Sequence, residues 1–135
     1  MLKLSKDNIP EKIAVKDFRT LLVYQKSMEL SREVYKVVKQ LPDIEKYAMA
    51  NQMIRAVTSI SSNLAEGQST LYGKKEMTFI SNALGSAGEM KCWYEHCLNL
   101  GYMSKDTFDM LDLDTSEIIK MLIGYAKKLK IELSI

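Results

Sequence analysis

The sequence is poor in the residues that most often build catalytic and metal-binding sites. Its 135 residues include one histidine, His96, and two cysteines, Cys92 and Cys97. A di-iron site in a helical bundle needs two Glu-x-x-His motifs, so a single histidine excludes that site. The two cysteines are too far apart in sequence for a CxxC redox or zinc motif. We therefore expect neither a metal nor a cofactor.

Enzyme motifs and membrane segments are also missing. There is no glycine-rich phosphate loop, and an Arg-x4-His ribonuclease signature would need arginine where the chain has Lys91. No apolar run approaches the roughly 20 residues that span a bilayer. The N-terminal stretch MLKLSKDNIPEK lacks the apolar region of a signal peptide. We expect a cytoplasmic protein that is not an enzyme and has no membrane partner.

What the sequence does contain is helical periodicity. Apolar residues recur at steps of three and four over residues 20–40, 43–66, 75–100 and 105–130, and no stretch alternates as a strand would. Short connections between long helices favour antiparallel neighbours. The pattern predicts an all-α fold, an antiparallel up-down-up-down four-helix bundle over residues 18–131. Residues 1–17 are expected to form a flexible arm and residues 132–135 a tail.

Turn residues suggest where these helices begin and end. Asp43 after Pro42 is expected to cap the second helix, and Gly67 is expected to end it in a left-handed conformation. Gly101 has the same position after the third helix. Small residues at 85–88, in the middle of that helix, predict the close approach of a neighbouring helix, because interior glycines otherwise destabilise a helix.

A polar seam runs along the second helix. Its members share one stripe at steps of three and four: Gln52, Arg55, Ser59, Asn63 and Glu66. Apolar residues flank the seam on both sides, so this helix is expected to be the most buried of the four.

The seam has two interpretations. If it is buried, or forms a subunit contact, Arg55 needs a carboxylate from another helix or subunit, because an unpaired buried charge is strongly destabilising. The candidates by position are Glu29, Glu33 and Glu89. The alternative is a seam that faces solvent.

Charge is unevenly distributed along the chain. Residues 1–42 and 120–135 are basic, and residues 102–119 are acidic. Such blocks attract partners of opposite charge; in the last helix they equally complement the helix dipole, with acids early and lysines late. The candidate phosphate-binding residues are Lys26, Arg32, Lys36 and Lys39 on the first helix and Lys120, Lys127, Lys128 and Lys130 on the last.

Several motifs at fixed spacing resemble a known family. They are Tyr24-Gln25-Lys26, the turn from Pro42 to Glu45, the run QMIRAVTSISSNLAEG that ends at Gly67, and Ser86 with Glu89. Together they resemble the proteins encoded by intervening sequences in bacterial 23S rRNA genes, over most of residues 18–130. Ser27 and Leu64 depart from the usual residues without affecting the expected fold.

The resemblance implies a four-helix bundle that assembles into a homo-pentameric ring, with nucleic-acid binding suggested by the genomic setting. The accessory protein of diversity-generating retroelements is similar in architecture. Two functions follow as hypotheses. One is a non-catalytic oligomer that binds the RNA or DNA backbone. The other is a protein-interaction scaffold or structural oligomer without nucleic acid, in which the seam fixes helix register or subunit orientation.

Overall fold

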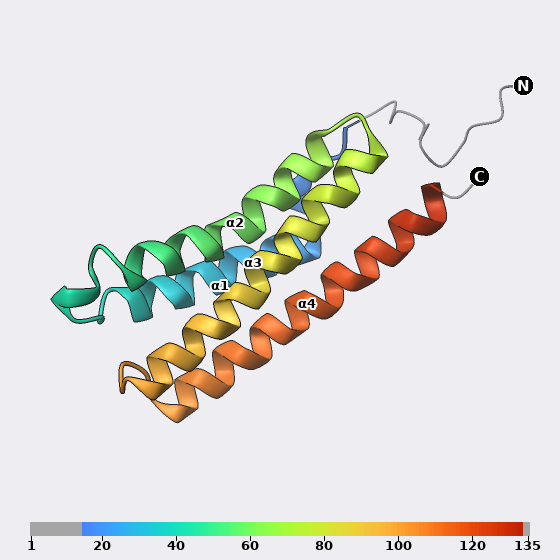
Figure 1. The fold of residues 1–135 in the computed structure, drawn as a ribbon. Helices are drawn as coiled ribbons and strands as arrows, with labels where there is room; N and C mark the ends of the chain where they lie inside the picture. The colour runs from blue at the N-terminus through green and yellow to red at the C-terminus, as the bar shows by residue number, and fades with distance from the viewer. Residues whose placement is uncertain (1–14, 134–135) are drawn as a thin grey trace, which may run out of the picture.

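The computed structural model describes residues 15–133, so residues 1–14 of the arm expected at residues 1–17 lie outside the described range. Its four helices are α1 (Leu22–Val38), α2 (Met49–Ser69), α3 (Gly73–Asn99) and α4 (Lys105–Leu133). Two short 3-10 helices, η1 (Phe18–Thr20) and η2 (Asp43–Glu45), precede α1 and α2. No β-strand occurs within residues 15–133. Successive helices run in opposite directions and lie side by side (Figure 1), which confirms the predicted all-α bundle.

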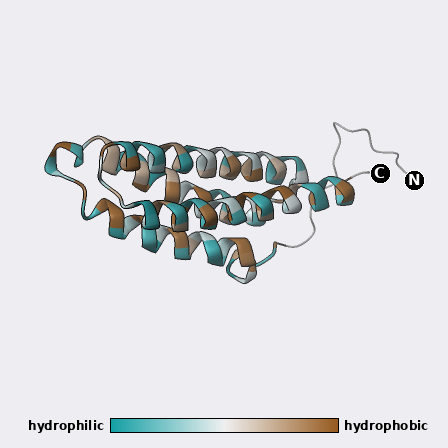
Figure 2. Ribbon diagram, turned by 90° about the horizontal axis from the view of Figure 1, so that it is seen from below, coloured by the Kyte–Doolittle hydropathy of each residue, from teal (hydrophilic) through white to brown (hydrophobic). Residues whose placement is uncertain are grey.

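The core lies along the axis of the bundle. Hydrophobic and hydrophilic positions alternate along every helix in Figure 2, as expected for amphipathic helices around one core. The largest fully buried apolar side chains come from all four helices: Val34, Met53, Val57, Ile60, Leu64, Ile80, Met90, Leu111, Ile118 and Leu122. Ten of the 21 residues of α2 are buried, against six of the 29 in α4. The prediction that the second helix is the most buried is therefore confirmed.

One polar pair crosses this core. Tyr94 of α3 is fully buried, and its hydroxyl lies 2.8 Å from that of Thr115 on α4. Burial raises the pKa of Tyr94, so the phenol stays protonated. Thr115 is a polar residue in the otherwise apolar row of the last helix. The hydrogen bond explains why a polar residue stands there, because a buried phenol without a partner is destabilising.

The predicted start of the second helix is wrong. Asp43 opens η2 rather than α2, and α2 begins only at Met49. The intervening chain forms tight backbone turns, with the amide of Lys46 donating to the Asp43 carbonyl at 3.1 Å. The Tyr102 hydroxyl donates to Glu45 Oε2 at 3.0 Å and joins this loop to the α3–α4 turn. This contact between distant segments has no local sequence signal.

The predicted role of Gly67 is also wrong. Gly67 lies inside α2, which continues to Ser69, and within the described chain the one glycine with a positive φ is Gly101, at 75°. A Cβ at Gly67 would lie 3.3 Å from the Cβ of Phe79 and 3.6 Å from the carbonyl oxygen of Glu76. Gly67 is thus required by the close approach of α3.

The close approach predicted at residues 85–88 does not involve its two glycines. Gly85 and Gly88 are exposed, and an added Cβ at either would meet nothing within 4 Å. The buried small residues of this region are Ala83 and Ala87, which are fully enclosed. At its end, α4 continues through Leu133, so residues 132 and 133, which were expected to belong to the tail, are helical.

The two kinds of glycine predict opposite effects of substitution. Gly67→Leu should lower the free energy of unfolding by about 1–3 kcal/mol, because the side chain overpacks the α2–α3 contact. Gly88→Leu should raise it by about 0.5–1 kcal/mol, because an exposed helical glycine is replaced by a better helix former. Urea unfolding followed by circular dichroism measures both. Equal effects at the two positions would contradict this assignment of the close contact.

Candidate functional site

The polar seam lies at the outer surface between α2 and α3. Gln52, Arg55 and Glu66 are exposed, whereas Ser59 and Asn63 are half-buried. The single chain therefore does not enclose the seam, and the prediction of a buried seam is wrong for an isolated bundle. The reason is that α1 and α3 flank α2 on its inner sides only. The interpretation as a subunit contact stays a prediction.

Hydrogen bonds at the centre of the seam join the two helices. The Asn63 amide donates to the Ser59 carbonyl at 2.8 Å and to the Ser59 hydroxyl at 2.9 Å. The Ser86 hydroxyl of α3 donates to the same Ser59 hydroxyl at 2.8 Å. Ser59 is thus the point at which the seam contacts α3, and its partners lie within the chain.

Arg55 lies at the exposed part of the seam. It shares a shallow groove of about 430 Å³ with Gln52, Ser59 and Glu89. Among the described residues, no carboxylate lies within ion-pair distance of Arg55, and Glu89 accepts instead from the Trp93 indole at 3.0 Å. Of the three predicted acids, only Glu89 is on this side of the bundle.

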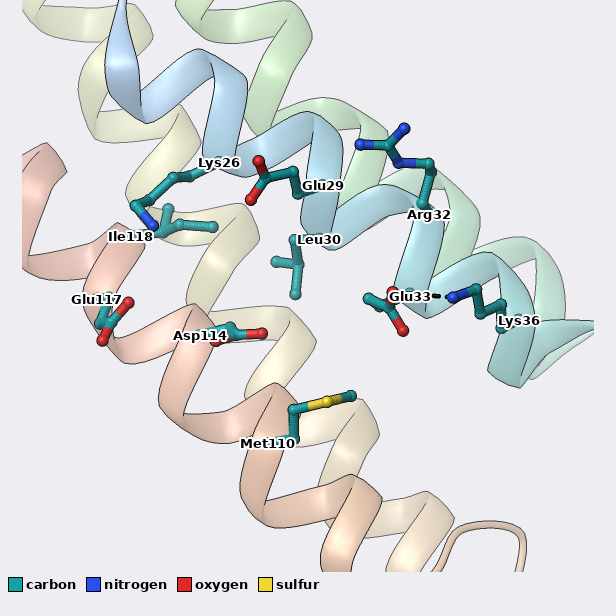
Figure 3. A pocket seen from close by; sticks show the side chains of 10 residues that line it. All are labelled: Lys26, Glu29, Leu30, Arg32, Glu33, Lys36, Met110, Asp114, Glu117 and Ile118. Carbon is teal, nitrogen blue, oxygen red and sulfur yellow. Dashed lines mark hydrogen bonds and ion pairs between the residues drawn. The ribbon is translucent and has the colours of Figure 1, made fainter.

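The other two acids, Glu29 and Glu33, line a groove of about 550 Å³ between α1 and α4 (Figure 3). These two helices pack less closely than the other neighbouring pairs. The α2–α3 face and the α1–α4 face are on opposite sides of the bundle, because α2 packs mainly on α1 and α3, and α4 packs mainly on α3 and α1. Glu29 and Glu33 therefore cannot meet Arg55 within one chain.

The first predicted basic group lies in this same groove. Lys26, Arg32 and Lys36 line it together with carboxylates from both helices, and in Figure 3 Lys26 extends toward α4 whereas Arg32 and Lys36 lie on the α1 side. Lys36 pairs with Glu33 at 3.0 Å. The antiparallel arrangement of α1 and α4 places the basic stretch opposite the acidic one, so these cations do not form a continuous phosphate-binding surface. Lys39, at the end of α1, is exposed.

Asp114 is the half-buried acid that faces this groove from α4. Burial raises the pKa of its carboxyl group, and Glu117, Glu33 and Glu29 raise it further. Lys26 acts in the opposite direction and lowers the same pKa. The carboxylates of the groove thus repel one another more strongly than the nearby lysine compensates.

The second predicted basic group has a different environment. Lys127, Lys128 and Lys130 are exposed near the end of α4, and Lys120 is exposed nearer its middle. The end of α4 lies beside the beginning of α1 and the α2–α3 turn (Figure 1). Cations from these segments form what we call the basic end, which comprises Lys16, Arg19, Lys74, Lys75, Lys127, Lys128 and Lys130.

Four members of the basic end were not among the candidate phosphate-binding residues predicted from the sequence. Lys16, Arg19, Lys74 and Lys75 are far from α4 in sequence, and only the fold brings them to the same end. The acids here are fewer: Asp17 pairs with Arg19 at 3.1 Å, Glu76 is buried, and Glu66 and Glu132 are exposed. The exposed charge of this end is therefore mainly positive.

The comparison with known proteins identifies the family. A family model described as 23S rRNA-intervening sequence protein matches residues 19–124. The chain belongs to this family. The match includes the whole polar seam and the α1–α4 groove, and it ends before Lys127, Lys128 and Lys130. This match confirms the family resemblance that the sequence motifs indicated, among them the run that ends at Gly67.

A solved structure of the same kind supports the fold of this 23S rRNA-intervening sequence protein. It is the crystal structure of a protein of unknown function from the S23 ribosomal protein family of Bacteroides thetaiotaomicron. The two chains share 27% identity with a TM-score of 0.73, over 78% of this chain and 96% of the other. Among curated proteins, none matches the chain.

The remaining candidate residues are dispersed. His96 is exposed, with its ring 5.4 Å from that of Trp93. Cys92 is exposed and Cys97 is buried, where its Sγ lies 3.7 Å from Met49 Sδ. In residues 15–133 no three His, Cys, Asp or Glu side chains gather as metal ligands would. Over the same range, no helix has the length and apolar character to cross a membrane.

The exposure of Arg55 predicts how the chain responds to its removal. Arg55→Ala should change the free energy of unfolding by less than about 0.5 kcal/mol, as surface substitutions usually do. The measurement is urea unfolding at a protein concentration at which light scattering finds monomers. A loss of a few kcal/mol that grows with protein concentration would instead mean that a second copy encloses the seam.

The raised pKa of Asp114 predicts a pH-dependent effect. The folded protein binds this proton more tightly than the unfolded chain does, so the contribution of Asp114 to stability falls as pH rises above its ordinary value of 3.8. Asp114→Asn should therefore stabilise the protein at pH 7, and the gain should vanish near pH 3. Asp109→Asn is the control, because Asp109 pairs with Lys105 at 2.6 Å and its loss should bring no gain. Equal gains at both pH values would contradict the assigned cause.

Proposed function

We propose that this protein is a non-catalytic, homo-oligomeric four-helix bundle of the cytoplasm whose basic end binds the phosphate backbone of RNA or DNA. The observation that carries the proposal is the convergence of exposed lysines and arginine from the start of α1, the start of α3 and the end of α4. Lysine and arginine bind phosphates largely without regard to sequence and release counterions when they do so.

Assembly would strengthen such binding. The family resemblance implies a pentameric ring, and a ring presents five copies of the basic end to one polymer. Several weak contacts on one polymer bind much more tightly than one contact alone. The same proposal gives the polar seam a role as a subunit contact.

Two observations support a head-to-tail contact between subunits: Arg55 has no ion-pair partner among the described residues, and the α1–α4 groove has four carboxylates against three cations. One face carries Arg55 in the α2–α3 groove, and the other carries Glu29 and Glu33 in the α1–α4 groove. Contacts between two different faces generate rings when the rotation closes. Arg55 of one subunit would then meet the acids of the next, which are the partners that its sequence position suggested.

A scaffold without nucleic acid is the second candidate. It is favoured by the α1–α4 groove, in which three of the eight predicted phosphate-binding residues lie among acidic side chains. In that case the ring would assemble in the same way, and the basic end would have no role in phosphate binding.

Salt dependence and two paired variants distinguish these functions. Light scattering gives the oligomeric state, and fluorescence anisotropy with labelled single- and double-stranded RNA and DNA at two salt concentrations gives affinity. The variant Lys127→Glu with Lys128→Glu should weaken binding about tenfold or more and flatten its salt dependence, because phosphate contacts are lost. The control, Lys39→Glu with Lys46→Glu at the opposite end, should change affinity much less. No binding at low salt would favour the scaffold, and a monomer would contradict the ring.

A further inference from the structure

Three sulfur atoms meet in the core, toward the end of the bundle that is opposite the basic end (Figure 1). Met49 and Met53 lie at the beginning of α2, and Cys97 lies in the last turn of α3. The Sγ atom of Cys97 lies 3.7 Å from Sδ of Met49 and 3.9 Å from Sδ of Met53. We call these three residues the sulfur cluster.

The sulfur cluster is enclosed by the core. Met53 and Cys97 have no exposed surface, and Met49 is 7% exposed. Packing alone requires apolar volume at such positions, and leucine or isoleucine supplies it with better-defined rotamers. The contact of one thiol with two thioethers is therefore a chemical feature in addition to the packing, because sulfur atoms can also bind metal ions.

The spacing of the sulfur atoms matches a three-coordinate metal ion. A zinc–thiolate bond is about 2.3 Å long, and three sulfur atoms at that distance around one ion lie about 4.0 Å apart. Two sides of the triangle in the sulfur cluster, at 3.7 and 3.9 Å, are close to this separation. Methionine side chains are unbranched and adaptable, so small movements would admit an ion between the three atoms.

The donor atoms and their charge select the kind of metal. Thiolate and thioether ligands are soft and suit Cu(I), whereas structural zinc sites almost always have four ligands from cysteine, histidine and carboxylates. One thiolate neutralises a monovalent ion. A divalent ion would keep a net positive charge in the core, which is strongly unfavourable. The expectation that the chain binds no metal rested on histidine and cysteine spacing and did not consider thioethers.

We propose that Cys97, Met49 and Met53 form a binding site for Cu(I), with one thiolate and two thioethers as its three ligands. The inference goes beyond the proposed function and does not depend on it, because the sulfur cluster lies away from the basic end. It assigns a soft monovalent metal ion to the core of the bundle.

Binding exchanges a proton for the metal ion. Burial raises the pKa of the Cys97 thiol to about 11, so the thiol is neutral near pH 7. Cu(I) forms bonds to the three sulfur atoms while the thiol proton leaves to solvent, and no oxidation state changes. The beginning of α2 gives the ion a route, since Met49 is its first residue and Ala48 provides no side-chain cap. An uncapped helix end is less stable than a capped one and opens more readily.

Cu(I) itself is the probe, in the absence of oxygen and in competition with a chromogenic chelator of Cu(I). Every protein carries Cys92→Ser, which removes the exposed thiol. The full-length chain should bind one Cu(I). Met49→Leu with Met53→Leu should weaken affinity by at least about a hundredfold, because loss of even an outer partner of a metal site costs about 10–100-fold. The matched control, Met28→Leu with Met110→Leu, removes two exposed methionines and should leave affinity unchanged.

Two further measurements make the test independent of the methionine variants. Cys97→Ser should abolish binding, and circular dichroism establishes whether each variant is folded. X-ray absorption at the copper edge needs no ligand variant, and it should find three sulfur neighbours at about 2.3 Å.

Three outcomes would overturn the inference. They are no binding of Cu(I), equal affinities in the two methionine pairs, and a copper environment with fewer than three sulfur atoms. In each case the sulfur cluster would be core packing alone. None of these outcomes affects the basic end, which the titrations with RNA and DNA test separately.

Discussion

The approach of α2 to α3 at Gly67 determines where the candidate sites of this bundle lie. With no side chain at Gly67, α2 can lie directly on the turn of α3 that contains Glu76 and Phe79. The same contact places the buried Gln68 beside the buried Glu76. Farther along the two helices it brings Ser59 to Ser86 at the centre of the polar seam. A change in the spacing of α2 and α3 would therefore alter the polar seam and the contact between Gln68 and Glu76 together.

Sequence reasoning predicted the helices well because the core imposes a periodic pattern. Each helix buries one stripe, and even the exception at Thr115 marks a real feature, its bond to the buried Tyr94. Asp43 and Gly67 were misassigned for a shared reason. Both have residue types that often cap helices, but their conformations are set by contacts with segments distant in sequence. Local preferences contain no information about such contacts.

The candidate site was predicted only in part, and the cause is again the arrangement of helices in space. Lys26 and Lys128 were both predicted to bind phosphate because they lie in basic stretches of the sequence. In the structure, Lys26 lies in a groove among carboxylates, whereas Lys128 lies at the basic end. Antiparallel packing decides this, because it places the start of α1 beside the end of α4. The buried hydrogen-bonded cluster of Gln68, Glu76 and Tyr125 could not be predicted at all, since its members come from three helices.

The uneven charge of α4 supports both of the interpretations open at the sequence level. Its early acids suit the helix dipole. Two of them also form ion pairs, Asp109 with Lys105 of the same helix and Asp112 with Lys91 of α3 at 3.3 Å. Its late lysines also suit the dipole, but α1 and α3 bring further cations to the same end, which no dipole argument requires. The clustering of charge from three helices is therefore the stronger indication of an anionic partner.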